Sequence, residues 1–148
     1  MKDRTFLVSV PADSRYLRAI RSFYLPVLEE TLGDSAAQMV ILALDEACSN
    51  IIKHTDASAL VARRIHVQAS LGVGGAKFRL RDFCEESDVP NIKPRDLNQL
   101  RPGGLGTHFI NKIMDRIVFE PDPETPGRVA LVMEKGMPAA EEGNRDEA

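Results

Sequence analysis

The spacing of apolar and polar residues along the chain predicts its first helices. Apolar residues at intervals of three and four predict one helix over about residues 14–32 and a second over about 35–54. Pro26 lies inside the first helix and is expected to kink or split it, because proline removes a backbone donor. The residues Gly33-Asp34-Ser35 separate the two helices and offer a cap for the second.

Alternation of apolar with polar residues predicts strands. Two alternating segments flank the turn Gly72-Val73-Gly74-Gly75 and predict a hairpin. A third helix is expected from Gly104 onward. The five predicted strands cover residues 4–10, 64–71, 77–83, 116–120 and 128–134. This order of elements predicts an α+β fold, a two-layer sandwich with helices on one face of a mixed, mostly antiparallel sheet.

The stretch between the hairpin and the third helix has no regular pattern. Residues of about 84–103 are strongly charged and contain three prolines. A loop of this length inside a compact domain is often a lid over a functional site. Residues 137–148 are polar and expected to fray. We therefore predict one domain over residues 1–136, with a lid at about 84–103, and a polar tail at 137–148.

Composition and charge narrow the classes of function. The net charge of −3 argues against direct binding of nucleic acid or an anionic membrane. No apolar run is long enough to span a membrane, and the N-terminal residues lack the apolar segment of a signal peptide. Cys48 and Cys84 have no metal-binding spacing and are expected to be free thiols. A cytoplasmic protein is therefore predicted.

The most informative segment is a polar stripe on the second helix. Most of that helix is apolar on every side, which predicts burial. Glu46, Asn50 and His54 recur at every fourth residue and share one face. Because an unpaired carboxylate is expensive to bury, the stripe is expected to face a cavity that holds something polar. A carboxylate can accept a proton and a carboxamide oxygen suits Mg²⁺, which together indicate a nucleotide site.

Two further motifs follow in the sequence. Asp82 ends a predicted strand, where a carboxylate can accept a hydrogen bond from the exocyclic amine of adenine. The run Gly103-Gly104-Leu105-Gly106 begins a predicted helix, and free backbone amides at such a start suit phosphate. Each motif alone also fits a plain structural role, as a strand end or a turn.

In this order and spacing, the three motifs resemble the N-box and the two glycine boxes of the GHKL (Bergerat-fold, histidine-kinase-like) ATPases. The string from Glu46 to His54 and the Gly-Leu-Gly helix ending in Met114-Asp115 resemble anti-sigma factors that are also serine kinases in bacterial partner-switching systems. The match covers roughly residues 5–135. The resemblance implies a protein serine/threonine kinase that binds ATP and Mg²⁺, together with a sigma factor and an antagonist (anti-anti-sigma, STAS-type) protein, and that forms a homodimer.

The resemblance also implies roles for individual residues. Glu46 matches the general base, Asn50 the Mg²⁺ ligand and Asp82 the aspartate that reads adenine. The phosphates are expected to lie against the helix start, and His54 closes the N-box with either a structural or a functional role. The residues of that helix start are Gly104, Leu105, Gly106 and Thr107.

The sequence departs from this family in the first glycine box. Cys84-Glu85-Glu86 follows Asp82-Phe83, so both glycines of the usual motif are missing and two acids are added. If Cys84 had to adopt a left-handed backbone, the strain would be about 1–2 kcal/mol, which corresponds to roughly a tenfold loss of affinity. The departure supports an alternative function, a catalytically weak or inactive binding module that regulates a partner by contact alone. A third alternative is the ATPase half of a histidine kinase. It is disfavoured because no dimerisation domain with its own phosphoacceptor histidine is expected before the first strand.

A basic stripe on the first helix concerns partners. Arg15, Arg18 and Arg21 follow one another at intervals of three, away from the apolar face. They form either a solvated surface or a docking site for an acidic partner.

Overall fold

The structure is a computed structural model that describes residues 3–53, 63–84, 108–124 and 129–136. Its helical elements are a short 3-10 turn η1 (Ser14–Tyr16) and the helices α1 (Leu17–Leu32), α2 (Asp34–Lys53) and α4 (His108–Ile113). Its strands are β1 (Arg4–Pro11), β2 (Arg63–Gly72), β3 (Gly75–Cys84), β4 (Arg116–Pro121) and β5 (Val129–Gly136).

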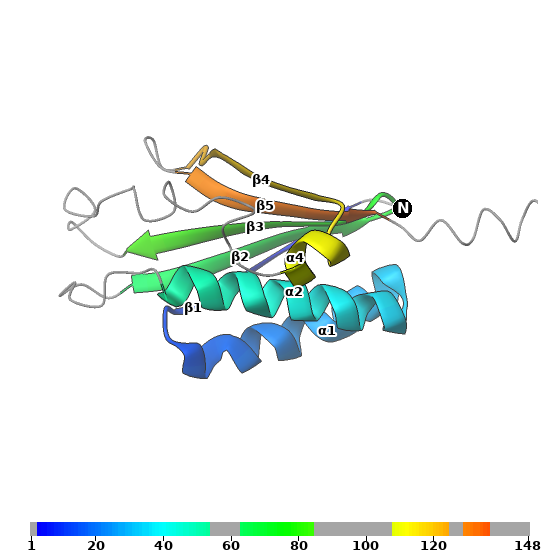
Figure 1. Cartoon of the computed structure of the whole chain (residues 1–148), viewed down its shortest axis with the longest axis horizontal. Coiled ribbons are helices and arrows are strands. Elements are labelled where there is room, and N and C mark those ends of the chain that lie inside the picture. The colour runs from blue at the N-terminus through cyan, green and yellow to red at the C-terminus, as the bar shows by residue number, and fades with distance from the viewer. Residues whose placement is uncertain (1–2, 54–62, 85–107, 125–128, 137–148) are drawn as a thin grey trace, which may run out of the picture.

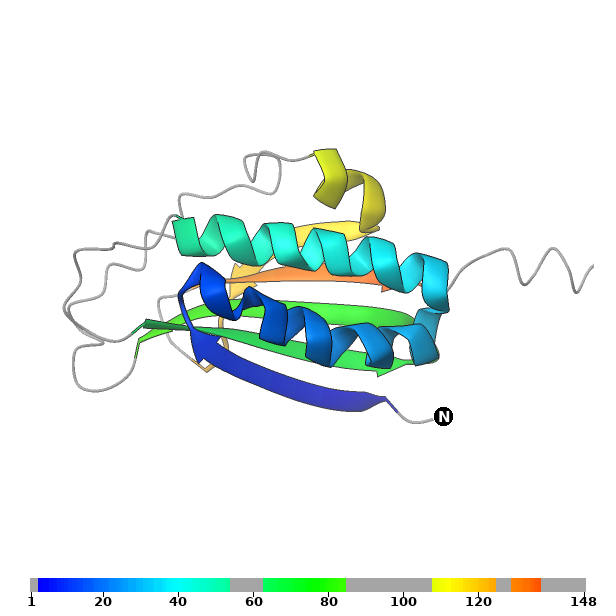
Figure 2. The same ribbon diagram turned by 90° about the horizontal axis from the view of Figure 1, so that it is seen from below.

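The five strands form one sheet in the order β1-β2-β3-β5-β4. Helices α1 and α2 lie side by side across one face of it, with α4 next to α2 (Figures 1 and 2). The predicted α+β sandwich, with its helices on one face, is confirmed. We expected a mixed, mostly antiparallel sheet, and all four pairings among the described strands are antiparallel.

The core lies between the helices and the sheet, and the predicted periods explain it. Alternate residues of β2 are fully buried, as period-two alternation requires of a strand with one covered face. On α1, Tyr24 is fully buried, and its hydroxyl donates a hydrogen bond to the backbone oxygen of Val67 at 2.6 Å. Its ring packs edge-on against Phe23 and Phe78, so one side chain ties α1 to both β2 and β3.

Proline 26 does not split the first helix. Helix α1 continues from Leu17 to Leu32 through Pro26, so this part of the prediction was wrong. Pro26 and Ser22 are both exposed. The backbone oxygen of Ser22, which loses its usual donor at residue 26, can therefore bond water.

One glycine makes the connection between the two long helices. Gly33 adopts φ of 87°, a left-handed value that residues with a side chain rarely take, and follows directly after α1. Helix α2 begins at the next residue, Asp34, whose charge suits the positive end of a helix dipole. No helix in the described ranges is both long and apolar enough to cross a membrane.

Candidate nucleotide site

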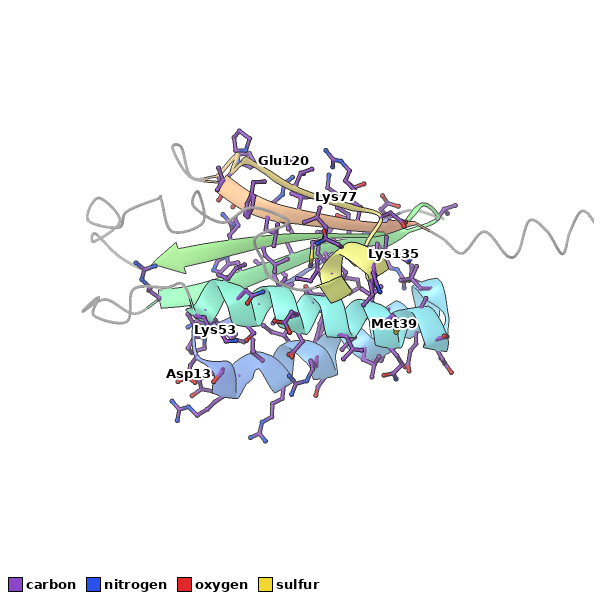
Figure 3. All side chains as sticks on the ribbon, viewed as in Figure 1. Asp13, Met39, Lys53, Lys77, Glu120 and Lys135 are labelled. Carbon is purple, nitrogen blue, oxygen red and sulfur yellow. The ribbon has the colours of Figure 1, made fainter. Side chains whose placement is uncertain are left out.

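Two of the three sequence motifs lie at the same end of the molecule. Helix α2 ends at Lys53, and β3 ends at Cys84 on the same side of the fold (Figures 1 and 3). The turn between β2 and β3 lies at the opposite end. The last turns of α2, with Glu46 and Asn50, and the strand end with Asp82 are therefore brought to one edge of the sandwich.

The burial predicted for α2 is confirmed only in part. Most apolar residues of this helix are buried as expected, but Met39 and Leu42 are exposed. Glu46 is half-buried in the same helical segment. Asn50, one turn later, is only 9% exposed. Within the described part of the chain, the Glu46 carboxylate has no hydrogen-bond or ion-pair partner. A half-buried carboxylate one turn from a buried carboxamide suits a general base beside a metal ligand.

The cysteine between these two residues has a structural role. Cys48 is fully buried in the core as a free thiol. Burial is the main reason that the pKa of its thiol lies far above the ordinary value, with the nearby Asp45 carboxylate adding to the effect. A thiol that stays protonated is a poor nucleophile, and the expectation of a free thiol is confirmed for Cys48.

The strand end that carries Asp82 is held unequally on its two sides. The pairing of β3 with β2 continues to Arg63–Cys84, and Asp82 pairs with the core residue Ile65. The pairing of β3 with β5 among the described residues reaches only Leu80–Leu131. Cys84 is part of the strand pairing, so its backbone is extended and not left-handed. The strain considered above for a left-handed Cys84 is therefore not found.

A cluster of charged residues, which sequence reasoning missed, lies next to Asp82. Arg81 points to the sheet face that the helices leave uncovered, yet it is only 7% exposed. Its guanidinium lies 3.3 Å from the carboxylate of buried Asp122 and 3.4 Å from that of Glu124. The same group lies 3.1 Å from Nδ1 of His66, its cross-strand neighbour. Arg81 therefore connects β3 to β2 and to the segment that follows β4.

Chemistry fixes the protonation of His66 in this contact. A guanidinium has only donors, so Nδ1 of His66 must accept, and the ring must be neutral with its proton on Nε2. Burial lowers the pKa of His66, and the positive charges of Arg81 and Arg64 lower it further. Glu124 and Asp122 oppose this shift.

The remaining predicted site residues lie outside the described residues. These are His54, Gly104, Leu105, Gly106 and Thr107, and the predicted lid at about 84–103 lies outside them apart from its first residue. Helix α4 begins at His108, directly after this segment, and packs beside α2. Its buried Ile110 and Ile113 form the apolar face of that helix.

The residues of the site fit a magnesium–nucleotide complex better than a metal held by protein alone. No group of three or more His, Cys, Asp or Glu side chains in the described ranges could hold a metal. Mg²⁺ in phosphate-transfer sites takes one or two protein ligands and completes its shell with phosphate oxygens and water. A single carboxamide such as Asn50 is sufficient for that arrangement.

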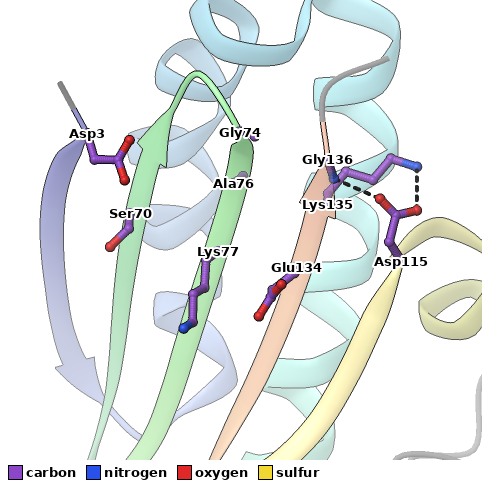
Figure 4. A pocket seen from close by; sticks show the side chains of 10 residues that line it. Asp3, Ser70, Gly74, Ala76, Lys77, Asp115, Glu134, Lys135 and Gly136 are labelled. Atoms are coloured by element: carbon purple, nitrogen blue, oxygen red, sulfur yellow. Dashed lines mark hydrogen bonds and ion pairs between the residues drawn. The ribbon is translucent and has the colours of Figure 1, made fainter. Parts of the chain in front are cut away.

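A separate hollow of about 330 Å³ lies at the opposite end of β3. Its lining includes Asp3, Ser70, Lys77 and Glu134, near the β2–β3 turn (Figure 4). Asp115 belongs to the Met114-Asp115 pair that ends the glycine-box helix of the resemblance. Its carboxylate accepts a hydrogen bond from the Gly136 amide at 2.7 Å and lies 3.8 Å from the Lys135 ammonium. Asp115 therefore joins the start of β4 to the end of β5, which is a structural role remote from the Asp82 end of β3.

The three arginines of the basic stripe on the first helix differ in their contacts. Arg15 pairs with Asp13, which caps η1, and Arg21 pairs with Asp45 of α2. Arg18 is exposed. With Ser14, the three arginines line a shallow hollow of about 320 Å³. Both readings of this stripe therefore stay open.

Two comparisons with known proteins place the whole fold in a family. The chain is similar to the serine-protein kinase RsbW of Halalkalibacterium halodurans, with 26% identity over 95% of this chain and 88% of that protein. The family model of the histidine kinase-like ATPase domain matches residues 10–135, which include every described element of the sheet and its helices at least in part. The chain is therefore a member of the histidine kinase-like ATPase domain family.

Proposed function

We propose that this protein is an ATP-binding anti-sigma regulatory factor that phosphorylates a serine or threonine of its antagonist protein. The observation that carries the proposal is that Glu46 and Asn50 lie one turn apart on α2, at the same end of the fold as the end of β3 with Asp82. Family membership supports ATP and Mg²⁺ as ligands. The similarity to a serine-protein kinase supports the class of acceptor.

The chemistry proposed for each residue is that of the family motif it matches. Asn50 would hold Mg²⁺, which neutralises charge on the triphosphate when bound. Glu46, half-buried and without a partner among the described residues, would orient the attacking hydroxyl and accept its proton. Asp82 would accept a hydrogen bond from the adenine amine. The backbone of Gly104, Leu105, Gly106 and Thr107 would bind the phosphates.

The partners follow from the same resemblance. A sigma factor and an anti-anti-sigma protein would compete for one surface, and the stripe of Arg15, Arg18 and Arg21 is our candidate for it. Arg18 is the best placed of the three to meet an acidic partner, because Arg15 and Arg21 already contact carboxylates within the chain. A homodimer, a cytoplasmic location and a single domain over residues 1–136 stay predictions.

A second function is favoured by one specific observation. Cys84-Glu85-Glu86 stands where the family pattern has glycines, and added acids near a triphosphate repel it. A protein that binds nucleotide weakly could still regulate a partner by contact alone. This second function predicts tight partner binding without phosphate transfer.

One experiment separates the two functions. Isothermal titration with Mg²⁺-ATP is followed by transfer of labelled phosphate to a cognate antagonist domain, and Asp82→Asn is titrated with ATP and with inorganic triphosphate. The kinase predicts ATP binding, transfer, and a loss in Asp82→Asn that is larger for ATP. Binding of a sigma factor or antagonist without any transfer would establish the contact-only function instead.

A further inference from the structure

The end of β3 needs a support that the backbone ladder does not provide. Past Leu80, the described pairings hold β3 only through β2. Arg81 is the first residue beyond that point, and its side chain reaches Asp122 and Glu124, which follow β4. On the intervening strand β5, the fully buried Ala130 is small enough to leave room for this reach.

We propose that Arg81 is a positioning residue for the nucleotide site. Together with His66, Asp122 and Glu124, it fixes the side of the β3 end where the pairing with β5 has stopped, and thereby the backbone at Asp82. Protonation of His66 removes part of this restraint. The inference rests on the proposed function, because Asp82 is the residue expected to read adenine.

The surroundings of Arg81 make its hold strong. Its side chain is 9% exposed and that of Asp122 only 4% exposed, so water screens their attraction little. Asp122 is itself fixed, because its other carboxylate oxygen accepts a hydrogen bond from the Glu124 amide at 3.0 Å. Charge-assisted bonds between fixed groups restrict the strand end more than mobile surface pairs do.

His66 makes the hold depend on pH. Among the described residues, the charged groups that act on its ring are Arg81 on β3, Arg64 on β2, and Asp122 and Glu124 after β4. A proton on Nδ1 would remove the acceptor for the Arg81 hydrogen bond. It would also place a positive imidazolium in contact with the positive guanidinium. The guanidinium would then keep its carboxylate contacts and lose its anchor on β2.

Arg79 provides a matched control. It lies on the same strand and the same face, two positions earlier, and pairs with Glu120 at 3.4 Å. Glu120 lies on the side of the sheet away from α1 and α2 (Figure 3). At Arg79 the ladder is intact on both sides, because this residue pairs with Gln68 and Val132. Loss of its side chain should therefore leave the strand end in place.

The first test requires no nucleotide. Hydrogen exchange is measured by mass spectrometry on a peptide that covers residues 81–84 in wild type, Arg81→Met and Arg79→Met. We expect exchange about tenfold faster in Arg81→Met only, because its strand end loses one of two supports. Equal exchange in all three proteins would overturn the inference, whether or not the chain binds ATP. If Arg81→Met fails to fold, Arg81→Lys replaces it, since a single ammonium cannot reproduce a planar set of donors.

The second test measures ATP affinity. Arg81→Met should weaken Mg²⁺-ATP by about tenfold and inorganic triphosphate much less, whereas Arg79→Met should bind both as wild type does. If wild type binds no ATP, the proposed function fails while the exchange result still decides the role of Arg81. Equal weakening by both variants would show a general loss of charge and would overturn the inference.

The third test concerns His66. The glutamine oxygen in His66→Gln can accept from Arg81 without titrating, so wild type should lose ATP affinity relative to this variant as the pH falls below about 6.5. The ratio of the two affinities is the readout, because nucleotide phosphate and every titratable group other than His66 are common to both measurements. A ratio that is constant from pH 7.5 to 5.5 would refute the part assigned to His66.

Discussion

The hydroxyl of Tyr24 offers a test of how α1 is attached to the sheet. This side chain is fully buried, and its hydroxyl donates to the Val67 backbone oxygen at 2.6 Å. Its ring centroid lies 4.9 Å from that of Phe23 and 5.4 Å from that of Phe78. Tyr24→Phe removes the hydrogen bond and keeps both ring contacts.

The expected loss follows from these contacts. A buried hydrogen bond contributes about 0.5–1.5 kcal/mol net. The backbone oxygen of Val67 keeps a second lone pair for the strand ladder, so we expect a loss near 1 kcal/mol and a fall in Tm of about 3 °C. Tyr24→Leu also removes the ring contacts, at about 0.5–1.5 kcal/mol each, and leaves a cavity. It should therefore lose about 2–4 kcal/mol.

Alkaline pH should narrow the gap between wild type and Tyr24→Phe. Burial raises the pKa of Tyr24 in the folded protein, with the Cys48 thiol a smaller cause. A raised pKa adds stability that is complete below the unfolded value of about 10 and is lost as the pH rises above it. Phenylalanine has no such dependence, so the advantage of wild type should shrink above about pH 10.

Urea unfolding followed by far-UV circular dichroism measures these differences, since the chain has no tryptophan for fluorescence. Wild type, Tyr24→Phe and Tyr24→Leu are compared at pH 7 and above pH 10. Two results would refute the reasoning: Tyr24→Phe at least as stable as wild type at pH 7, or a stability gap that does not change in alkali.

Four further predictions address the site and its surroundings. Glu46→Gln should keep ATP binding and reduce phosphate transfer by roughly 10²–10⁴-fold, measured with labelled ATP and a cognate antagonist. Asn50→Ala should reduce both, because the metal loses a ligand; calorimetry showing unchanged Mg²⁺-ATP affinity would contradict its role. The pKa of His66 is lowered in the folded protein, so its contribution to stability is present above the unfolded value of about 6.5 and is lost as the pH falls. Urea titrations should therefore show that His66→Gln loses less stability than wild type towards pH 5. In a Cys84→Ser variant, whose single cysteine is Cys48, the thiol should resist a reagent such as DTNB until the protein unfolds, and rapid labelling in the native state would disprove its burial.

Local patterns in the sequence were sufficient for most of the fold. The turn at Gly72–Gly75 and the alternation on both sides of it predicted the β2–β3 hairpin, because both are properties of neighbouring residues. The helices could be placed within a few residues for the same reason. The position of β5 between β3 and β4 depends on contacts between distant segments, which no local period encodes.

The site was predictable where it rests on one helix and not where it rests on long-range pairs. Glu46 and Asn50 share a face because they are one turn apart. The contact of Arg81 with Asp122 joins residues 41 positions apart, and alternation places Arg81 on an uncovered face where burial is not expected. The continuity of α1 through Pro26 likewise depends on the surroundings, because exposed Ser22 can bond water.

The topology also implies an order in which the sheet assembles. The turn of the β2–β3 hairpin encloses only Val73 and Gly74, so little chain entropy opposes its closure. The nearest pair between β1 and β2, Pro11–Arg64, encloses both long helices. Contacts between distant residues form late, so β1 should join the hairpin only after α1 and α2 have packed. A nascent chain would therefore keep its N-terminal strand unpaired until both long helices and β2 have been synthesised.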